Sequence, residues 1–188
     1  MCNRYRVTAA RAELLARFGI LIEPEPDRLP PPELFPKRPA YVLREVAGQR
    51  VLDVMTWGFP PPAAARSPVT NVRNLASPFW RTALARPDRR CLVPVTEFCE
   101  WEGEKGSTVA RWFSVPSRPI FSFAGVWRPT DDGNAFAFLT CEPNPLIAPI
   151  HPKAMPVVLH EDDESRWLAG DDATELAQPY PSQLMAVA

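Results

Sequence analysis

Residues 90–102 read Arg90-Cys91-Leu92-Val93-Pro94-Val95-Thr96-Glu97-Phe98-Cys99-Glu100-Trp101-Glu102. This stretch is rich in β-branched and aromatic residues, and short runs of the same kind follow it. Turn residues at 103–106, 117–119 and 131–133 separate the runs, a spacing typical of an antiparallel sheet or barrel. The pattern predicts strands at 90–95, 97–102, 109–115, 120–127 and 135–141.

The residues on either side of this region predict a mixture of strands and helices. Before it we expect a strand at 3–7, a helix at 9–18 with Thr8 as its cap and Gly19 as its stop, and a hairpin of 40–46 and 49–55 about Ala47-Gly48. Ser77-Pro78 predicts the start of another helix. After the strand-rich region we expect a helical turn at 144–150, a strand at 156–159, and helices at 163–169 and 173–177.

These elements predict one α+β domain over residues 2–188. We expect it to be β-rich, with an antiparallel pseudo-barrel and flanking helices. Residues 24–39 contain seven prolines and predict a surface loop. Residues 161–188 predict an acidic C-terminal helical tail.

The composition excludes several classes of protein. No apolar run approaches 18 residues, so we expect no membrane span, and we see no signal peptide. The four cysteines form no C-x-x-C pair and the chain has two histidines, so we expect no metal and no cofactor. We expect reduced thiols in a monomeric cytoplasmic protein, associated with the nucleoid if the source is bacterial.

Charge is segregated along the chain, although the formal net charge is only −1. Residues 63–95 contain six arginines and one acid, and residues 1–22 contain four arginines and one acid, whereas residues 161–188 contain seven acids and one arginine. Arginine suits bidentate recognition of phosphate. The pattern favours a polyanionic partner, and a solvated surface is the alternative interpretation.

Cys2 follows the initiator methionine directly. Its side chain is small enough for an aminopeptidase to remove Met1, which would leave an α-amine and a thiol on adjacent carbons. The two groups ordinarily titrate near pH ~7.7–8.0 and ~8.5, so both have a nucleophilic fraction at neutral pH. With an aldehyde, the amine can form an imine and the thiol can then close a thiazolidine ring. The alternative is that Cys2 merely begins a strand.

Three further positions are candidates for a functional site. On the predicted strand 97–102, Glu100 shares a face with Phe98, where desolvation would raise the carboxyl pKa and suit it for acid–base chemistry. His151 follows an apolar turn and could move protons, or could be an ordinary loop histidine. Trp57-Gly58-Phe59 could stack on a base, although burial in the core is the commoner fate of such rings.

Several motifs together resemble one known family. They are MCNRYR at 1–6, WGF at 57–59, NVR at 71–73, RRCLVPVTEFCEW at 89–101, FAGVW at 123–127 and PIHPKAMPVVL at 149–159. In this order, over about residues 2 to 160, they resemble the SRAP family, named for "SOS-response-associated peptidase", which includes the abasic-site processing protein of animal cells. The resemblance implies binding of single-stranded DNA and covalent capture of abasic sites in the DNA damage response.

The resemblance also implies roles for individual residues. Cys2 would form the thiazolidine, Asn71 would hydrogen-bond the reacting sugar or the adjacent phosphate, and Glu100 would move protons during imine formation and ring closure. His151 would assist opening of the sugar ring or elimination of the 3′ strand, a lyase step. DNA would be contacted by Arg4, Arg73, Lys153, Trp57 and Phe59.

Three departures from the family pattern affect these assignments. Asn3 replaces the usual glycine. The N-A-R-x-E-T stretch becomes Asn-Val-Arg-Asn-Leu at 71–75 and lacks the family's glutamate. The usual I-H-x-R-M-P becomes Ile-His-Pro-Lys-Ala-Met-Pro at 150–156, which is one residue longer and has Lys153 in place of the arginine.

Two other functions are compatible with the sequence. Cys2 could be the nucleophile of a peptidase or amidohydrolase, whose machinery could also remove Met1 autocatalytically. Such an enzyme would turn over amides without DNA. A non-catalytic single-strand-binding module would instead bind abasic and intact strands alike and would never become covalently attached.

Overall fold

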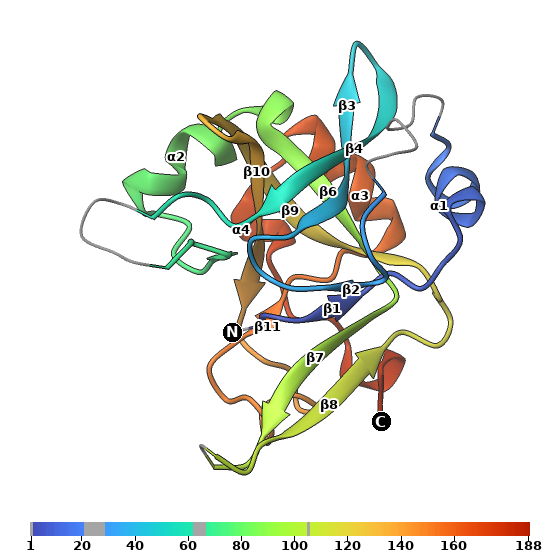
Figure 1. The fold of residues 1–188 in the computed structure, drawn as a ribbon, viewed down its shortest axis with the longest axis vertical. Coiled ribbons are helices and arrows are strands. Elements are labelled where there is room, and N and C mark those ends of the chain that lie inside the picture. Colours follow the sequence, from blue (N-terminus) through green and yellow to red (C-terminus); the bar gives the residue numbers. More distant parts are fainter. Residues whose placement is uncertain (1, 21–28, 62–66, 105) are drawn as a thin grey trace.

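The computed structural model describes residues 2–20, 29–61, 67–104 and 106–188 (Figure 1). Its strands are β1 Tyr5–Arg6, β2 Glu33–Leu34, β3 Pro39–Val46, β4 Gln49–Trp57, β5 Asn71–Val72, β6 Arg90–Val95, β7 Glu97–Glu102, β8 Val109–Ser114, β9 Phe121–Thr130, β10 Gly133–Cys141, β11 Met155–Pro156 and β12 Ala186–Val187. Its helices are α1 Arg11–Phe18, α2 Pro78–Leu84, α3 Glu161–Ala169 and α4 Ala173–Leu176, with short 3₁₀ turns η2 Pro87–Arg89 and η3 Ser182–Leu184.

Within this described part of the chain, five strands close into a barrel. Their order is β10-β4-β3-β6-β9, and β9 pairs again with β10. The β3–β4 hairpin turns at Ala47 and Gly48, which both have positive φ, at 51° and 76°. A two-residue type I′ turn requires this conformation, and its twist matches that of the paired strands. The predicted α+β class, the barrel and this hairpin are therefore confirmed.

A second sheet has the order β12-β8-β7-β1-β2 and lies beside the barrel (Figure 1). Here β1 is inserted between two strands, with Tyr5 opposite Leu34 on one side and Phe98 on the other. The parallel pairing of β10 with β4 completes the otherwise antiparallel barrel, and the short β5 also pairs with β10 in parallel. Local sequence did not indicate these two pairings, because parallel partners are joined by long connections rather than by a turn.

An aromatic cluster joins the two sheets. Tyr5 and Phe98 come from the second sheet, and Trp57, Phe123 and Phe138 come from the barrel; all five are fully buried. The Tyr5 ring lies edge-on to Trp57 with centroids 5.1 Å apart, and Phe123 and Phe138 are separated by 4.8 Å. Because Tyr5 is anchored in this core, the short strand β1 holds the N-terminal residues at a fixed place.

One helix cap was predicted correctly and another was not. Ser77 accepts a hydrogen bond from the Phe79 N–H at 3.4 Å, as a cap of α2 should. The prediction that Thr8 caps the first helix is wrong, because α1 begins two residues later, after Ala10. The Thr8 hydroxyl instead lies 3.2 Å from that of Thr96, at the bend between β6 and β7.

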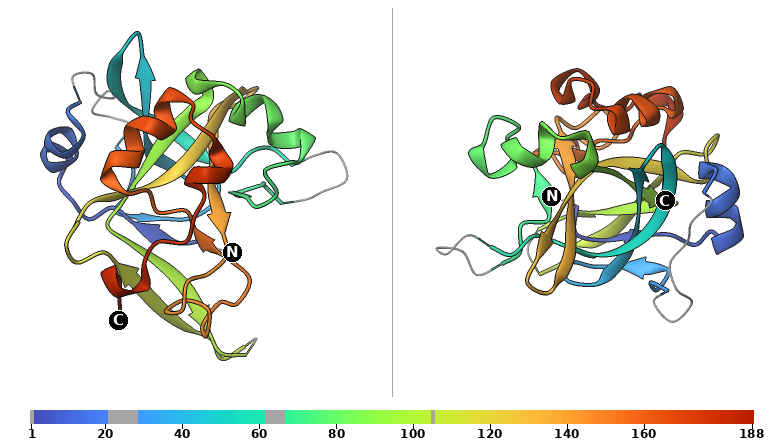
Figure 2. Two further views of the ribbon diagram at one scale, coloured as in Figure 1. Left: turned by 180° about the vertical axis from the view of Figure 1, so that it is seen from behind. Right: turned by 90° about the horizontal axis from the view of Figure 1, so that it is seen from above.

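The acidic C-terminal segment packs against the barrel. The back view in Figure 2 shows α3 and α4 across its outer surface, and α3 contacts β6 and β9. The buried Trp167 donates its indole N–H to the carbonyls of Cys91 and Gly125, at 3.0 and 3.1 Å. The chain then returns to the second sheet, where β12 pairs with β8.

Of the predicted proline-rich loop at 24–39, residues 24–28 lie outside the described residues, and 29–39 include β2 and the first residue of β3.

All four cysteines are free and buried. Cys91, Cys99 and Cys141 lie on β6, β7 and β10, where they behave as buried apolar residues. The described helices include none that is long and apolar enough to cross a membrane.

A buried carboxylate ties the C-terminal helix to the rest of the domain. Glu164 on α3 is 1% exposed and accepts hydrogen bonds from Arg17 at 3.0 Å, Arg118 at 3.1 Å and Ser122 at 2.8 Å. These partners come from α1, from the segment before β9, and from β9 itself. The network therefore joins three parts of the fold through one side chain.

We expect Glu164→Gln to lower the free energy of unfolding by about 1–3 kcal/mol, because an amide oxygen accepts the hydrogen bonds of the two arginines and Ser122 less strongly than a carboxylate does. Glu161→Gln is the matched control: Glu161 also pairs with Arg17, at 3.5 Å, but its side chain is 62% exposed. An exposed pair contributes only ~0–1 kcal/mol. Urea unfolding of both variants measures the difference, and equal losses would contradict this account.

Candidate active site

The pairing of β1 with β7 directs the N-terminal residues along β7, the strand that carries Glu100. The Cys99 N–H donates to the Arg4 carbonyl at 2.9 Å, so the chain continues beside β7 beyond the two residues of β1. Cys2 lies at the end of this extension and is 1% exposed. Its thiol is 3.5 Å from the Arg4 carbonyl oxygen. The predicted nucleophile is thus held in the interior beside the second sheet.

The environment of Cys2 does not favour the thiolate. Burial raises the pKa of the Cys2 thiol well above its ordinary value, and the negative charge of Glu100 raises it further. The expectation of a usable thiolate fraction at neutral pH is therefore wrong for this buried position. Because the sulfur carries its proton, an attack by sulfur requires a nearby group that accepts that proton.

Glu100 has the properties of such a proton acceptor. It is 1% exposed on β7, and burial raises the pKa of its carboxyl to about 7. Among the described residues, none donates a hydrogen bond to its Oε1 atom. A carboxyl that is half ionised near neutrality can both take and return a proton. Alternation along β7 had predicted this burial beside Phe98.

His151 faces the same carboxyl. Its Nδ1 lies 2.8 Å from the carbonyl oxygen of Ala154, and since a carbonyl only accepts, Nδ1 carries the hydrogen. Burial lowers the pKa of His151, so the ring is neutral at pH 7 and its Nε2 is unprotonated. This Nε2 lies 3.9 Å from Oε2 of Glu100. Ala154 belongs to the segment at 150–156 that departs from the family pattern, and its carbonyl thus orients the ring of His151.

Asn71 is the first residue of β5 and lies opposite Phe138 of β10. It is 7% exposed, its Oδ1 accepts a hydrogen bond from the Thr70 hydroxyl at 3.3 Å, and its Nδ2 has no partner among the described residues. The end of β10 pairs in turn with β11, which begins directly after Ala154. Contiguous strands therefore connect Asn71 to the loop of His151.

The two arginines predicted to bind DNA are already paired with carboxylates. Arg4 donates to Glu33 at 2.6 Å, and its guanidinium lies over the rings of Trp101 and Trp112. Arg73 pairs with Glu142 and donates to the Cys141 carbonyl at 3.0 Å. Sequence reasoning missed both glutamates, because no local pattern links positions so far apart. Lys153, the third predicted cation, is exposed.

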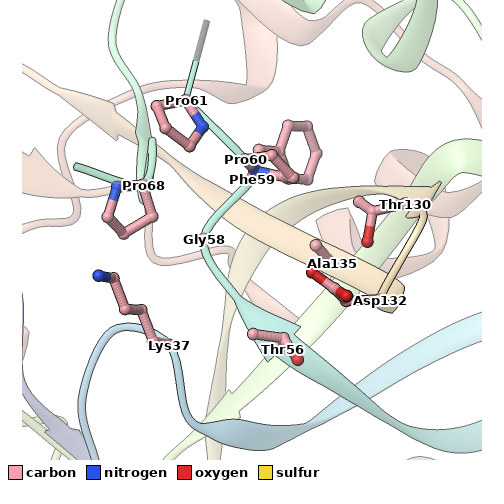
Figure 3. A pocket seen from close by; sticks show the side chains of 10 residues that line it. All are labelled: Lys37, Thr56, Gly58, Phe59, Pro60, Pro61, Pro68, Thr130, Asp132 and Ala135. Atoms are coloured by element: carbon pink, nitrogen blue, oxygen red, sulfur yellow. The ribbon is translucent and has the colours of Figure 1, made fainter. Parts of the chain in front are cut away.

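The prediction that Trp57 and Phe59 stack on DNA is not met in this conformation. Both side chains are fully buried, and the Trp57 indole N–H donates to the Thr70 carbonyl at 3.2 Å. Gly58 between them has φ 111°, and a Cβ there would lie 2.9 Å from Pro68, so only glycine fits this bend. Figure 3 shows the bend beside a cleft of about 320 Å³, with Lys37 on one side and Thr130 and Asp132 on the other.

The geometry thus brings Glu100 and His151 together, with Cys2 close enough for the charge of Glu100 to act on its thiol, whereas the predicted arginines are held by carboxylates. A family model described as SOS response associated peptidase (SRAP) matches residues 1–188. The chain belongs to the SRAP family. Membership in the SRAP family supports a role in the DNA damage response and an association with DNA. No curated protein matches the chain.

Solved structures share the SRAP-like fold. A protein from Bordetella bronchiseptica has a TM-score of 0.83 at 20% identity, covering 100% of this chain and 98% of that one. A protein from Bacteroides thetaiotaomicron has a TM-score of 0.82 at 22% identity, covering 99% and 90%. A phage-related protein from Bordetella bronchiseptica has a TM-score of 0.75 at 16% identity, covering 100% and 93%. At these identities the likeness concerns the fold alone.

No group of three or more His, Cys, Asp or Glu side chains suited to a metal ion occurs among the described residues of this SRAP protein.

Proposed function

We propose that this protein captures abasic sites in single-stranded DNA through a thiazolidine formed by Cys2 after removal of Met1. The observation that carries the proposal is the position of Cys2 beside a buried carboxyl with a pKa of about 7. An abasic deoxyribose in its ring-opened form is an aldehyde, the electrophile that an aminothiol requires. SRAP membership supports the choice of DNA as the partner.

The proposed reaction forms two bonds and releases one water molecule. The α-amine of Cys2 attacks C1′ of the sugar, and loss of water gives an imine. The sulfur then attacks the imine carbon, and the thiol proton passes through Glu100 to the nitrogen. Because the pKa of the Cys2 thiol is raised, the Glu100 carboxylate contributes most to the rate at this transfer of the thiol proton.

The other site residues have roles that follow from their contacts. His151, neutral and unprotonated at Nε2, accepts the proton of the sugar's C1′ hydroxyl during ring opening and returns it to the departing ring oxygen, which becomes the 4′ hydroxyl. The same nitrogen could remove a C2′ proton, the step that a lyase activity needs. The unpartnered Nδ2 of Asn71 donates to the sugar or its phosphate. Lys153 and the arginines Arg4 and Arg73 bind flanking phosphates, the arginines after exchanging a carboxylate for phosphate.

The peptidase alternative has weaker support at this site. A Cys–His hydrolase requires a thiolate stabilised by a neighbouring cation, which lowers the thiol pKa. Here burial and Glu100 raise the pKa of Cys2, and burial keeps His151 neutral. We retain one peptidase-like step in the proposal, the autocatalytic removal of Met1, which needs only one turnover.

The test is the intact mass of the purified protein before and after incubation with single-stranded DNA that carries one abasic site. We expect loss of Met1 and a new species equal to protein plus DNA less one water. Undamaged DNA of the same sequence is the control. Loss of Met1 with no adduct would reject capture and leave the hydrolase function.

We expect Arg73→Ala to weaken binding of intact single-stranded DNA and to reduce the salt dependence of the affinity by about 0.7 in log–log slope, the contribution of one phosphate contact. Glu142→Gln, which frees Arg73 from its ion pair, should strengthen binding at low salt. Fluorescence anisotropy over a salt series measures both. An unchanged slope in Arg73→Ala would show that Arg73 does not contact phosphate.

A further inference from the structure

A second cleft, of about 330 Å³, lies on elements that do not contribute to the site around Cys2. It is formed by α2, by η2 with the residue before it, by residues 127–129 of β9 and by Phe59. Its walls include three arginines, Arg86, Arg89 and Arg128, together with the rings of Phe79 and Trp127. The proposed reaction uses none of these side chains.

Arg128 is a partly buried cation without a counter-ion in the described part of the chain. Its guanidinium lies over two rings, 4.4 Å from the centroid of Phe59 and 4.8 Å from that of Phe79. The side chain of Arg128 has no hydrogen-bond or carboxylate partner among the described residues, and burial lowers its pKa. A desolvated cation of this kind gains most from an anion that enters the cleft.

The other two arginines share a single acid. Arg86 donates to both carboxylate oxygens of Asp88, at 2.9 and 2.6 Å. Arg89 approaches Asp88 only to 4.0 Å, and its guanidinium lies 4.5 Å from the centroid of the Trp127 ring. Three cations and one carboxylate leave the cleft with a net charge of +2. Arg89 and Arg128 are therefore the cations available to a ligand.

The geometry of these two arginines selects a planar, phosphorylated ligand. The Arg89 guanidinium lies over one aromatic ring and that of Arg128 over two, contacts that hold both cations in place and leave their N–H donors for an anion. Bidentate donation by arginine suits phosphate, and a base can stack on an aromatic ring of the cleft wall, Phe79 or Trp127. The cleft volume falls at the lower end of the range of small-ligand sites, about 300–1,000 Å³.

We propose that this cleft binds one nucleotide of the single-stranded DNA, away from the abasic site held at Cys2. The inference rests on the proposed function for its choice of strand rather than free nucleotide. In this proposal Arg89 and Arg128 bind a phosphate of the strand. DNA is then a polyanionic partner of the arginine-rich segment 63–95, to which Arg89 belongs. The proposal also implies that affinity increases with strand length, since a longer strand can occupy the cleft and the site around Cys2 at once.

The experiment compares Arg89→Met, Arg128→Met and the double variant with the wild-type protein. Methionine keeps an unbranched side chain over the rings and removes the charge. Binding of intact single-stranded DNA is measured over a salt series for a short and a long oligonucleotide. We expect the log–log salt slope for the long strand to fall by about 0.7 in each single variant and about 1.4 in the double variant. The fall should be smaller for the short strand, which cannot occupy the cleft and the site around Cys2 at once.

Arg44→Met is the matched control, because Arg44 also lies over the Trp127 ring, at 5.2 Å, but is paired with Asp53 and does not line the cleft. It should keep the wild-type slope. Equal slopes in the wild-type protein and the double variant would overturn the proposal. So would binding of a free deoxynucleoside monophosphate that depends on Arg89 and Arg128 while strand binding does not.

Crosslinking of a short abasic oligonucleotide separates this inference from the proposed function. It should proceed at the wild-type rate in all three variants, which also shows that they fold. If no protein, wild type included, forms the adduct, the proposed function fails, while the salt slopes with intact DNA still decide whether the cleft binds the strand.

Discussion

Cys2→Ala should abolish the stable adduct with abasic DNA and leave the affinity for intact single-stranded DNA within about twofold of wild type. Alanine is small enough for an aminopeptidase to remove Met1 without help from Cys2, so the processed variant exposes an α-amine but has no sulfur to close the ring. Reaction with the aldehyde therefore stops at an imine, which water reverses. Denaturing electrophoresis after acid or heat treatment should show no adduct, whereas borohydride reduction should trap a fraction of the imine.

Cys99→Ala is the control for a general thiol effect. Cys99 is buried on β7, and its charge state influences the thiol of Cys2, so it lies close to the site. As an internal residue it has no α-amine and cannot form a thiazolidine. Adduct formation should persist in Cys99→Ala. A stable adduct with Cys2→Ala would refute the aminothiol mechanism.

Glu100→Gln should slow adduct formation by about 10²–10⁴-fold, the usual contribution of a positioned acid–base group. The substitution keeps the shape of the side chain and removes its ability to take the thiol proton. Single-turnover kinetics with excess protein measures the rate. Glu102→Gln is the matched control on the same face of β7, where Glu102 pairs with Arg111 and is less buried. It should react at the wild-type rate.

The pH dependence gives a second test of Glu100. The wild-type protein reacts fast only when the pH exceeds both the carboxyl pKa of Glu100, about 7, and the pKa of the α-amine, ~7.7–8.0. Below pH 6.5 the logarithm of the wild-type rate should rise with a slope of about 2, and that of Glu100→Gln with a slope of about 1. Identical slopes would remove Glu100 from the proton transfer.

The same carboxyl affects stability in a defined direction. Because its folded pKa is raised, the folded protein binds more protons than the unfolded chain between pH ~4.3 and about 7. The contribution of Glu100 to the free energy of unfolding is therefore largest at low pH and falls as pH rises through this window. Glu100→Gln lacks this fall and should be at least as stable as wild type at pH 8, so a slower reaction cannot be attributed to unfolding.

Much of the fold follows from local patterns. The strands at 90–95 and 97–102 were predicted with their observed bounds, because alternation and turn residues act over a few positions. The Ala47-Gly48 turn and the Ser77-Pro78 helix start have equally local causes. The burial of Glu100 was also predictable, since residues on one strand face share an environment with their neighbours.

The sequence by itself determined the chemistry available, namely an aminothiol precursor at Cys2, a carboxyl on an apolar strand and a histidine in a turn. Only the tertiary structure decided how these groups behave. It raises the pKa of the Cys2 thiol, pairs Arg73 with Glu142 and buries Trp57 in the core. Desolvation and ion pairing depend on which distant segments pack together, and that packing is a property of the whole folded chain rather than of any short stretch of it.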